Sequence, residues 1–550
     1  MNFQLSEQKL ITMPPHKPLS SLKDICIQWT LEWISSVVKV CGSHQQHKYQ
    51  RLYLISALSS NIRQHLLFLT FRQPLYERNL TYKCLVLQLL GDQNTRSVDF
   101  SCAGIAYLYE VNYLYRILTQ VQITNLTRLG INCNLRTMAD KKCLMEVNAT
   151  FYPVFNKMTN LRWVRLVGVA DKTLLTALGM NCPHLEYLYV DESHRVNDEA
   201  VAKLLLRDSM DVAFQNIKDF DLQDIPTNPC ASSLKVIGLN GTEVSMKSVL
   251  TILHCVPYLE SFEGDVNVGS LCKIMESLQP EDGHRSFNLQ KLWDTRILPN
   301  QALLIDRVCP HLTYLSTDAS SLFALHLLSS VSSLTLKLYF QNATIEIYNY
   351  LLVSGVNLRE LVLVDHINCC LDLTWLVELT PNLEHLEATI MKEEGRNMSQ
   401  WPLLTTAKIT LESSKPLFAL MTHAPILKDL DVTFEAWSGL DTFEDINDTL
   451  ITNAVASGSL QNLQKLKINK CAISMKGIDC LILNCPDLMY LAPLAFWNGV
   501  SHEDLQILHQ RTKENNWCFR LVLRVDWEDD QRSSGICHNN DKSALMLACS

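Results

Sequence analysis

Reactive side chains are plentiful in this chain of 550 residues, but they form no recognised catalytic or metal-binding pattern. The 19 cysteines include no Cys-x-x-Cys pair, and no histidine–cysteine group has the spacing of a zinc site. A glycine-rich phosphate loop, His-Glu-x-x-His and Gly-x-Ser-x-Gly are also missing from the sequence. We therefore expect a protein that is not an enzyme and that holds no metal or cofactor.

Non-covalent binding is the chemistry that the residue types favour. Tryptophan, tyrosine and arginine residues that could form one binding surface stand close together in the chain: Arg162, Trp163, Arg165, Tyr187 and Tyr189. These three residue types dominate the energetically important positions of protein–protein interfaces. Whether the five side chains share one surface depends on the elements that carry them.

The net charge narrows the class of partner. The chain has 48 lysines and arginines against 57 aspartates and glutamates, which leaves a net charge of −9 and a pI of about 6.0. An excess of negative charge disfavours general binding to nucleic acid or to an anionic membrane. Apolar residues make up 47% of the chain, enough for a large core. We expect protein partners, with no nucleic acid and no membrane.

The cysteines also bear on the cellular compartment. Their number is odd, and Cys369 and Cys370 are adjacent, which is too constrained for an ordinary structural disulfide. Residues 1–17 lack the continuous apolar run of a secretory signal, and the apolar window 322–340 is too polar to span a membrane. We expect buried free thiols in a cytoplasmic or nuclear protein.

An internal repeat organises most of the chain. The pattern apolar-x-x-apolar-x-apolar recurs, complete or in a variant form, with a mean spacing of about 26 residues. Its copies begin at Leu126, Leu161, Leu185, Ile217, Leu234, Leu259, Leu289, Leu312, Val331, Leu358, Leu383, Leu404, Leu427, Leu463 and Leu488. No single repeat of this kind can bury its own apolar face, so neighbouring repeats must stack into one continuous core.

Prolines mark a boundary inside the repeat. In six copies a proline stands two residues before the first apolar position, namely Pro183, Pro257, Pro310, Pro381, Pro425 and Pro486. A helix-like stretch lies upstream of each of them. Proline cannot continue a helix and holds the preceding residue in an extended conformation, so each one predicts a switch from helix to strand.

Three of these prolines follow a cysteine directly, at Cys182, Cys309 and Cys485. With the repeat, this resembles the cysteine-containing subclass of leucine-rich repeats found in many substrate receptors of ubiquitin ligases, over roughly residues 95–495. The resemblance implies an α/β solenoid with a curved parallel sheet on its concave side and helices on its convex side. We expect the solenoid to span residues 76–500, followed by a C-terminal cap and polar tail at 501–550.

Alternation along the strands predicts which side chains face a partner. Successive side chains of a strand point to opposite sides, so the residues between the repeat's apolar positions face outward from the concave side. Arg162, Trp163 and Arg165 would lie on one strand, beside Tyr187 and Tyr189 on the next. We expect these five residues to bind a protein substrate.

A helical module is expected before the repeats. Residues 1–20 are polar, contain three prolines and read as a disordered lead-in, and residues 21–75 read as helical. Apolar residues spaced three and four apart define the first helix: Leu22, Ile25, Cys26, Trp29, Trp33 and Val37. A second helical stretch runs through Leu54, Leu58, Ile62 and Leu66.

Both helices resemble motifs of known ligase receptors. Residues 21–26 match the start of the elongin-C-binding BC-box, although Thr30 stands where the box has an aliphatic residue. Residues 58–66 look like a cullin-2 box in which Ser59 replaces the usual proline. Their order ahead of leucine-rich repeats resembles the PRAME and Zyg types of receptor. The resemblance implies elongin B/C and cullin-2 as partners, with Leu22, Ile25 and Cys26 on elongin C and with Leu58, Ile62 and Leu66 on the cullin.

Other interpretations of this module remain open. The two helices can simply cap the exposed end of the solenoid, as terminal repeats require. In that case the chain is a leucine-rich repeat scaffold or inhibitor with no link to a ligase. An F-box would be the third possibility, but its opening Leu-Pro pair is present here only in reverse order, as Pro18-Leu19.

Overall fold

The computed structural model describes residues 22–40, 44–73, 78–135, 138–207, 226–263, 270–279, 285–339, 342–365, 369, 371–392, 398–411, 413–434, 442–515, 517 and 520–521. They belong to two compact units, the N-terminal unit up to Thr313 and the C-terminal unit from Tyr314. The expected lead-in, residues 1–20, and the tail after residue 521 lie outside the described residues.

The N-terminal unit begins with four helices, α1 (Leu22–Val40), α2 (His44–Ala57), α3 (Ser60–Phe71) and α4 (Leu80–Leu90). Strands and helices then alternate: β1 (Ser97–Ile105), α5 (Leu108–Val121), β2 (Arg128–Cys133), α6 (Met138–Phe155), β3 (Trp163–Val167), α7 (Lys172–Asn181), β4 (Tyr187–Tyr189), α8 (Asp198–Leu205), β5 (Val236–Gly238), α9 (Met246–Cys255), β6 (Ser261–Glu263), α10 (Leu271–Ser277), β7 (Lys291–Trp293) and α11 (Pro299–Val308). Each strand from β1 to β7 pairs in parallel with the next.

The C-terminal unit continues the alternation. Its main elements are β8 (Tyr314–Asp318), α12 (Leu322–Leu325), β9 (Ser333–Lys337), α13 (Thr344–Ser354), β10 (Glu360–Val364), β11 (Leu371–Asp372), α14 (Leu373–Leu379), β12 (His385–Lys392), β13 (Thr406–Leu411), α15 (Lys415–His423), β14 (Asp429–Phe434), α16 (Asp448–Ala456), β15 (Lys465–Ile468), β16 (Cys471–Ser474), α17 (Met475–Asn484), β17 (Tyr490–Ala492), β18 (Trp497–Gly499), α18 (His502–Glu514) and β19 (Arg520–Leu521). Parallel pairing runs through β8, β9, β10, β12, β13, β14, β15, β17 and β19 in that order.

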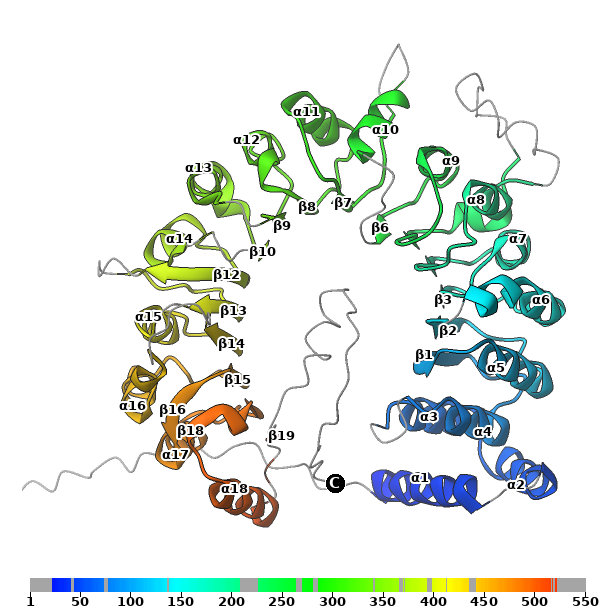
Figure 1. The fold of residues 1–550 in the computed structure, drawn as a ribbon, viewed down its shortest axis with the longest axis horizontal. Helices are drawn as coiled ribbons and strands as arrows, with labels where there is room; N and C mark the ends of the chain where they lie inside the picture. Colours follow the sequence, from blue (N-terminus) through cyan, green and yellow to red (C-terminus); the bar gives the residue numbers. More distant parts are fainter. Residues whose placement is uncertain are drawn as a thin grey trace, which may run out of the picture. The chain divides into compact units, whose positions relative to one another are not determined.

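Within each unit the helices lie on one side and the strands on the other (Figure 1). The apolar positions of the repeat fill the space between them, and Leu129, Val164, Leu188, Leu361 and Leu430 are fully buried. The strands leave their other side uncovered by these helices, and we call that side the strand face. The chain is thus an α/β leucine-rich repeat solenoid preceded by a small helical module, as predicted.

The prolines mark the ends of helices, as the sequence predicts. The residue before each of the six prolines is a helix C-cap whose N–H donates to the carbonyl four residues earlier: Cys182, Val256, Cys309, Thr380, Ala424 and Cys485. Their ψ angles lie between 58° and 89°, which turns the chain away from the helix. All six side chains are buried between repeats, which explains why small or apolar residues occupy this position.

One expected repeat is wrong. Strand β4 pairs directly with β5, with Leu188 opposite Ile237, so no strand stands between them for the copy at Ile217, Phe220 and Leu222. Those three residues lie outside the described residues. Leu206 and Thr227, which flank this part of the chain, meet in an antiparallel bridge. A matching apolar pattern was therefore present where no partner strand was available.

Asn228 caps the end of helix α8. Its buried carboxamide donates to the carbonyls of Lys203, Leu204 and Leu206, at 2.9, 3.0 and 3.0 Å. These carbonyls belong to the last turn of α8, where helix carbonyls lack partners within the helix. Asn228 therefore satisfies the end of α8 beside the paired strands β4 and β5.

Strand β1 was not among the predicted copies of the repeat. Strand β1 precedes the first predicted copy, and its Val98 and Phe100 are buried like other repeat positions. The first apolar position is taken by Thr95, which is also buried. Its hydroxyl accepts from the Asp92 N–H at 3.0 Å, which satisfies a polar group in an apolar position. Because Thr95 is polar, this copy does not match the apolar spacing of the repeat.

Candidate functional site

Helix α1 is apolar on two sides. Leu31, Ile34 and Val38 are buried, and the Ser35 hydroxyl lies 2.8 Å from that of Tyr82 on α4, so this side docks the helix on the module. The other side is exposed although it is also apolar, and it consists of Leu22, Ile25, Cys26, Trp29 and Trp33. We call this second side the α1 stripe.

The α1 stripe is unusual for a surface. Leu22 is 78% exposed and Trp29 72% exposed, and the stripe repeats at helical spacings along 12 residues. Isolated exposed apolar residues are common, whereas a contiguous stripe of large ones marks an interaction site. All three residues expected to contact elongin C, Leu22, Ile25 and Cys26, are on this exposed side.

The segment expected to contact a cullin is divided between two helices. Helix α2 ends at Ala57 and α3 begins at Ser60, so Leu58 lies in the break rather than inside one continuous helix. Leu58 is half-buried and Ile62 is 47% exposed. Leu66 is only 1% exposed, because the side of α3 that carries it packs inside the module. Its expected contact with a cullin is therefore corrected: Leu66 is a core residue.

Helix α3 also covers the edge of the sheet. The Gln64 carboxamide oxygen accepts from the N–H groups of Arg96 and Ser97, at 2.9 and 3.3 Å, and its nitrogen donates to the Ser97 carbonyl at 2.9 Å. One side chain thus replaces the backbone groups of a further strand beside β1. An uncovered edge strand is a template for unwanted pairing, so α3 acts as a cap whatever else the module does.

A buried arginine ties the cap together. Arg63 donates to the carbonyls of Ile55, Leu58 and Leu90, at 3.1 Å from Ile55 and 3.2 Å from Leu90, and it forms an ion pair with Asp92. These partners belong to α2, to the break after it, to the end of α4 and to the loop that follows. Polar contacts therefore cross-link α2, α3 and α4, and α1 packs on α4.

The expected substrate residues are brought together, with one exception. Trp163 and Arg165 on β3 lie opposite Tyr187 and Tyr189 on β4, and the rings of Trp163 and Tyr189 are 5.8 Å apart. These four half-exposed residues form a patch on the strand face. Arg162 precedes β3 and lies at the strand-entry edge instead, so it does not belong to the patch.

Arg128 is a member of the patch that sequence reasoning missed. Its guanidinium lies 3.7 Å from the centre of the Trp163 ring, and it pairs with Asp99 at 3.3 Å. A signal was present, because Arg128 occupies the same repeat position on β2 as Trp163 on β3. We call Arg128, Trp163, Arg165, Tyr187 and Tyr189 the aromatic patch.

Asp191 and Arg165, at one end of the aromatic patch, are incompletely paired. Burial raises the pKa of Asp191, while the Asn240 N–H at 2.9 Å and the positive charge of Arg165 act against that rise. The Nε of Arg165 is itself buried and has no hydrogen-bond partner. A buried donor of this kind is costly to leave unsatisfied.

Among the described residues, the cysteines that precede prolines are apolar packing groups. Burial raises the pKa of the thiols of Cys182, Cys309 and Cys485 to about 12, so they stay protonated at neutral pH and pack as apolar groups. No group of three His, Cys, Asp or Glu side chains in the described part of the chain could hold a metal ion. Nor is any described helix long and apolar enough to cross a membrane.

Comparisons with known proteins add little. No protein-family model and no curated protein matches the sequence. Similar crystal structures include the Rad7–Elc1 complex in yeast, at 15% identity over 90% of this chain and 91% of that one, with a TM-score of 0.29. The TLR13–ssRNA13 complex is 14% identical over 74% and 64%, with a TM-score of 0.35. A protein from Bacteroides fragilis is 12% identical over 45% and 77%, at 0.25. These scores are too low to carry an argument about function.

Proposed function

We propose that this protein is a non-catalytic substrate receptor of a cullin-RING ubiquitin ligase, in the cytoplasm or nucleus. Helix α1 would bind elongin C of the elongin B/C adaptor, and the solenoid would hold a protein substrate. Catalysis would belong to the recruited ligase components. The observation that carries the proposal is the α1 stripe, the exposed apolar face of a helix whose opposite side is packed on the module.

The chemistry of α1 suits docking into a groove of another protein. A helix binds in this mode through apolar side chains spaced three, four and seven residues apart. Leu22 and Cys26 are one turn apart on the exposed side, and Trp29 continues the same side. Burial of one exposed leucine contributes about 1.5–3 kcal/mol. The BC-box resemblance selects elongin C as the partner.

Thr30, which departs from the BC-box pattern, is compatible with such docking. Its hydroxyl donates to the Cys26 carbonyl at 2.6 Å, so the polar group is already satisfied inside α1. A polar group that enters an interface without a partner costs free energy, but a satisfied one costs much less. The threonine methyl group can then occupy part of the space of an aliphatic side chain.

A cullin-2 contact, if it follows the adaptor, would use Leu58 and Ile62. Both side chains are at least partly accessible at the start of α3. Leu66 has no role in this contact because it is buried in the cap. The proposed cullin surface is therefore smaller than the sequence motif implies.

Co-purification with elongin B/C and cullin-2 tests the proposal. The full chain should capture elongin B/C, and Leu22→Ala with Cys26→Ala should reduce the captured amount at least tenfold, since two anchoring side chains are truncated. Ile345→Ala with Leu352→Ala is the matched control, because both residues are exposed apolar side chains of α13. Thermal unfolding should confirm that all variants are folded.

Two results would overturn the proposal. If the wild-type chain captures neither elongin B/C nor any other cullin adaptor, the protein is not a ligase receptor. If the folded double variant captures elongin B/C as well as the wild type does, the α1 stripe is not the docking surface.

The competing function is a leucine-rich repeat scaffold or inhibitor in which the module only caps the solenoid. The contacts of Gln64 and Arg63 favour a capping role. They do not account for the α1 stripe, since a cap needs only its buried side. Capture of an adaptor, including an F-box-type adaptor, separates the two functions.

A further inference from the structure

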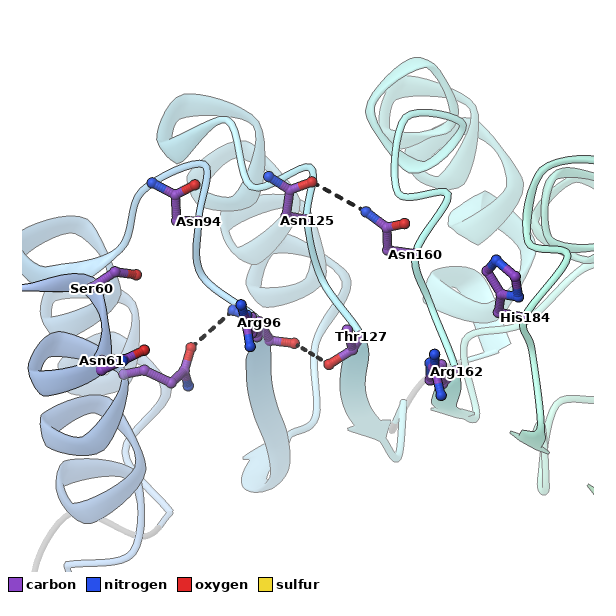
Figure 2. Close-up of a pocket in the computed structure, with 10 residues that line it drawn as sticks. Ser60, Asn61, Asn94, Arg96, Asn125, Thr127, Asn160, Arg162 and His184 are labelled. Carbon is purple, nitrogen blue, oxygen red and sulfur yellow. Dashed lines mark hydrogen bonds between the residues drawn. The ribbon is translucent and has the colours of Figure 1, made fainter.

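A polar groove runs along the strand-entry edge of the N-terminal unit, on the side where the repeats pass from helix to strand (Figure 2). It has a volume of about 570 Å³ and begins at the first turn of α3, with Ser60 and Asn61. It then crosses the loops that lead into β1, β2, β3 and β4. We call it the entry groove.

Two columns of side chains line the entry groove. The first column holds the residue just before the first apolar position of each repeat, and it consists of Asn94, Asn125, Asn160 and His184. The second column holds the residue just after that position, and it contributes Arg96, Thr127 and Arg162. Because the columns follow the repeat, the groove presents the same kind of contact at regular steps.

The charge of the lining has one sign. Arg96 and Arg162 line the entry groove together with His184, and none of the ten lining residues is an aspartate or glutamate. This contrasts with the chain as a whole, whose net charge is −9. Glu186 follows in the second column and lies a long 3.5 Å from Arg162. The groove therefore complements a negatively charged ligand.

Several of the polar groups have no partner inside the protein. The side chains of Arg96 and Asn94 form no hydrogen bond or ion pair with the described residues, although both are exposed in the groove. The Asn160 nitrogen donates to the Asn125 oxygen at 3.2 Å, which leaves the Asn125 nitrogen available as a donor. The groove thus contains both donors and acceptors that point to open space (Figure 2).

Two asparagines at the same repeat position of the C-terminal unit are used differently. In the C-terminal unit, Asn382 donates to the Val356 carbonyl at 2.8 Å, and Asn462 donates to the Pro425 carbonyl at 2.9 Å. There the carboxamide fastens one repeat to the backbone of the preceding one. Among the described residues, no such backbone contact forms for Asn94, Asn125 or Asn160. The asparagines of the entry groove therefore do not fasten one repeat to the next in this way.

We propose that the entry groove binds an extended, acidic peptide segment of a partner protein. Carboxamides carry a donor and an acceptor side by side, which matches the N–H and C=O groups of an extended backbone. Arg96 and Arg162 would pair with glutamate or aspartate side chains through charge-assisted hydrogen bonds. The lining includes no tryptophan, tyrosine or phenylalanine on which successive nucleic-acid bases could stack, which favours a peptide over RNA.

This inference does not depend on α1, so it can fail while the proposed function stands, and the reverse also holds. If both are correct, the acidic segment belongs to a substrate of the ligase. A loss of adaptor capture on mutation of Leu22 and Cys26 should leave peptide binding by the groove unchanged.

Fluorescence anisotropy of the full chain tests the inference with three labelled probes. These are an eight-residue peptide that alternates glutamate and serine, the same peptide with glutamine for glutamate, and a single-stranded RNA of eight nucleotides. The glutamate peptide should bind at least tenfold more tightly than the glutamine peptide. Its affinity should fall as the salt concentration rises, because exposed charges are screened.

Variants locate the binding site. Arg96→Ala with Arg162→Ala should weaken binding of the glutamate peptide at least tenfold, since two charge-assisted contacts are lost. Arg116→Ala is the matched control, because Arg116 is an exposed arginine on α5, away from the groove, and should change the affinity less than twofold. Thermal unfolding confirms that the variants are folded.

Three outcomes would overturn the inference. Equal binding of the glutamine and glutamate peptides would remove the role of charge. Unchanged binding by the folded double variant would place the site elsewhere. Tighter binding of RNA than of the glutamate peptide would show that the groove recognises phosphate groups.

Discussion

The strand faces of the two units are built on the same scaffold but carry different chemistry. On the N-terminal unit, Arg128, Trp163 and Tyr189 form a half-exposed cluster of one guanidinium and two rings. On the C-terminal unit, the corresponding positions of β12 to β15 carry lysines opposite acids. The leucines beneath both faces are equally buried.

The charges of the C-terminal strand face satisfy one another. Three cross-strand ion pairs follow in sequence, Lys408–Glu387 at 2.9 Å, Lys465–Asp429 at 2.8 Å and Lys467–Asp431 at 2.9 Å. A partner that bound here would have to remove water from paired charges and would gain few new contacts. The aromatic patch contains one such pair, Arg128–Asp99, at a longer 3.3 Å, and its rings carry no charge to desolvate.

The difference shows that the repeat specifies the scaffold and leaves the strand face free to vary. Glycines help the aromatic patch to form: a Cβ at Gly130 would lie 2.4 Å from the Asp99 carboxylate, and one at Gly238 would lie 2.9 Å from that of Asp191. Both acids lie beside arginines of the patch. Removing side-chain bulk at two positions therefore makes room for the charges that flank the rings.

Truncation of the shared core should have the largest effect on both units. Leu188→Ala in β4 and Leu430→Ala in β14 each remove a fully buried side chain and should lower the free energy of unfolding by about 2–5 kcal/mol. Chemical denaturation of each variant measures this loss. A loss below about 1 kcal/mol in one unit and not in the other would show that the two cores are not equivalent.

Truncation of the aromatic patch should have an intermediate effect on stability. Trp163→Ala removes the contact with Arg128, worth about 0.5–1 kcal/mol, and the contact with Tyr189, worth about 0.5–1.5 kcal/mol. Unfolding should therefore become about 1–2.5 kcal/mol easier. Thr410→Ala, at an outward-facing position of β13, is the control and should change stability by less than about 0.5 kcal/mol. Equal effects of the two variants would contradict the packing of the patch.

The ion pairs of the C-terminal strand face should contribute less to stability than the contacts of the aromatic patch. The more buried pair should contribute more than the more exposed pair. The side chains of Lys467 and Asp431 are 17% and 19% exposed, whereas those of Lys465 and Asp429 are 54% and 36% exposed. Double-mutant cycles with alanine should give a coupling near 1 kcal/mol for the first pair and about 0.2–0.5 kcal/mol for the second. A reversed order would mean that burial does not decide the strength of these pairs.

High salt should have the smallest effect of these changes. It should weaken the ion pair on the C-terminal strand face and leave the ring contact on the N-terminal one. In 1 M sodium chloride the Debye length falls to about 3 Å, so the coupling between Lys465 and Asp429 should fall close to zero. The coupling between Trp163 and Tyr189, measured by the same cycle, should not decrease, since ring contacts do not depend on screening. A parallel loss of both couplings would indicate an ionic origin for the contacts of the aromatic patch.

The local features of the fold could be predicted because short segments of the chain dictate them. A leucine at fixed spacing can only be buried by a neighbouring repeat, and a proline just after a helix prevents the helix from continuing, as after Cys182 and Cys485. Alternation along a strand placed Trp163 and Tyr189 on the same side. In each case the physical cause acts within a few residues of the position in question.

Contacts between segments that are distant in the sequence decided the features that the local pattern did not predict. The spacing of Leu66 resembled that of Ile62, but packing within the module buried the first and left the second exposed. Ile217 satisfied the repeat pattern, yet β4 already paired with β5. Thr95 broke the pattern and was nevertheless accepted, because Asp92 supplied a hydrogen bond.

The sequence alone thus determined the repeat, the ends of its helices and the outward-facing side of each strand. Only the tertiary structure decided which apolar side of α1 remains uncovered and where unpaired polar groups gather into a groove. The physical reason is that periodicity and proline act through the local backbone, whereas exposure depends on which distant segments pack nearby.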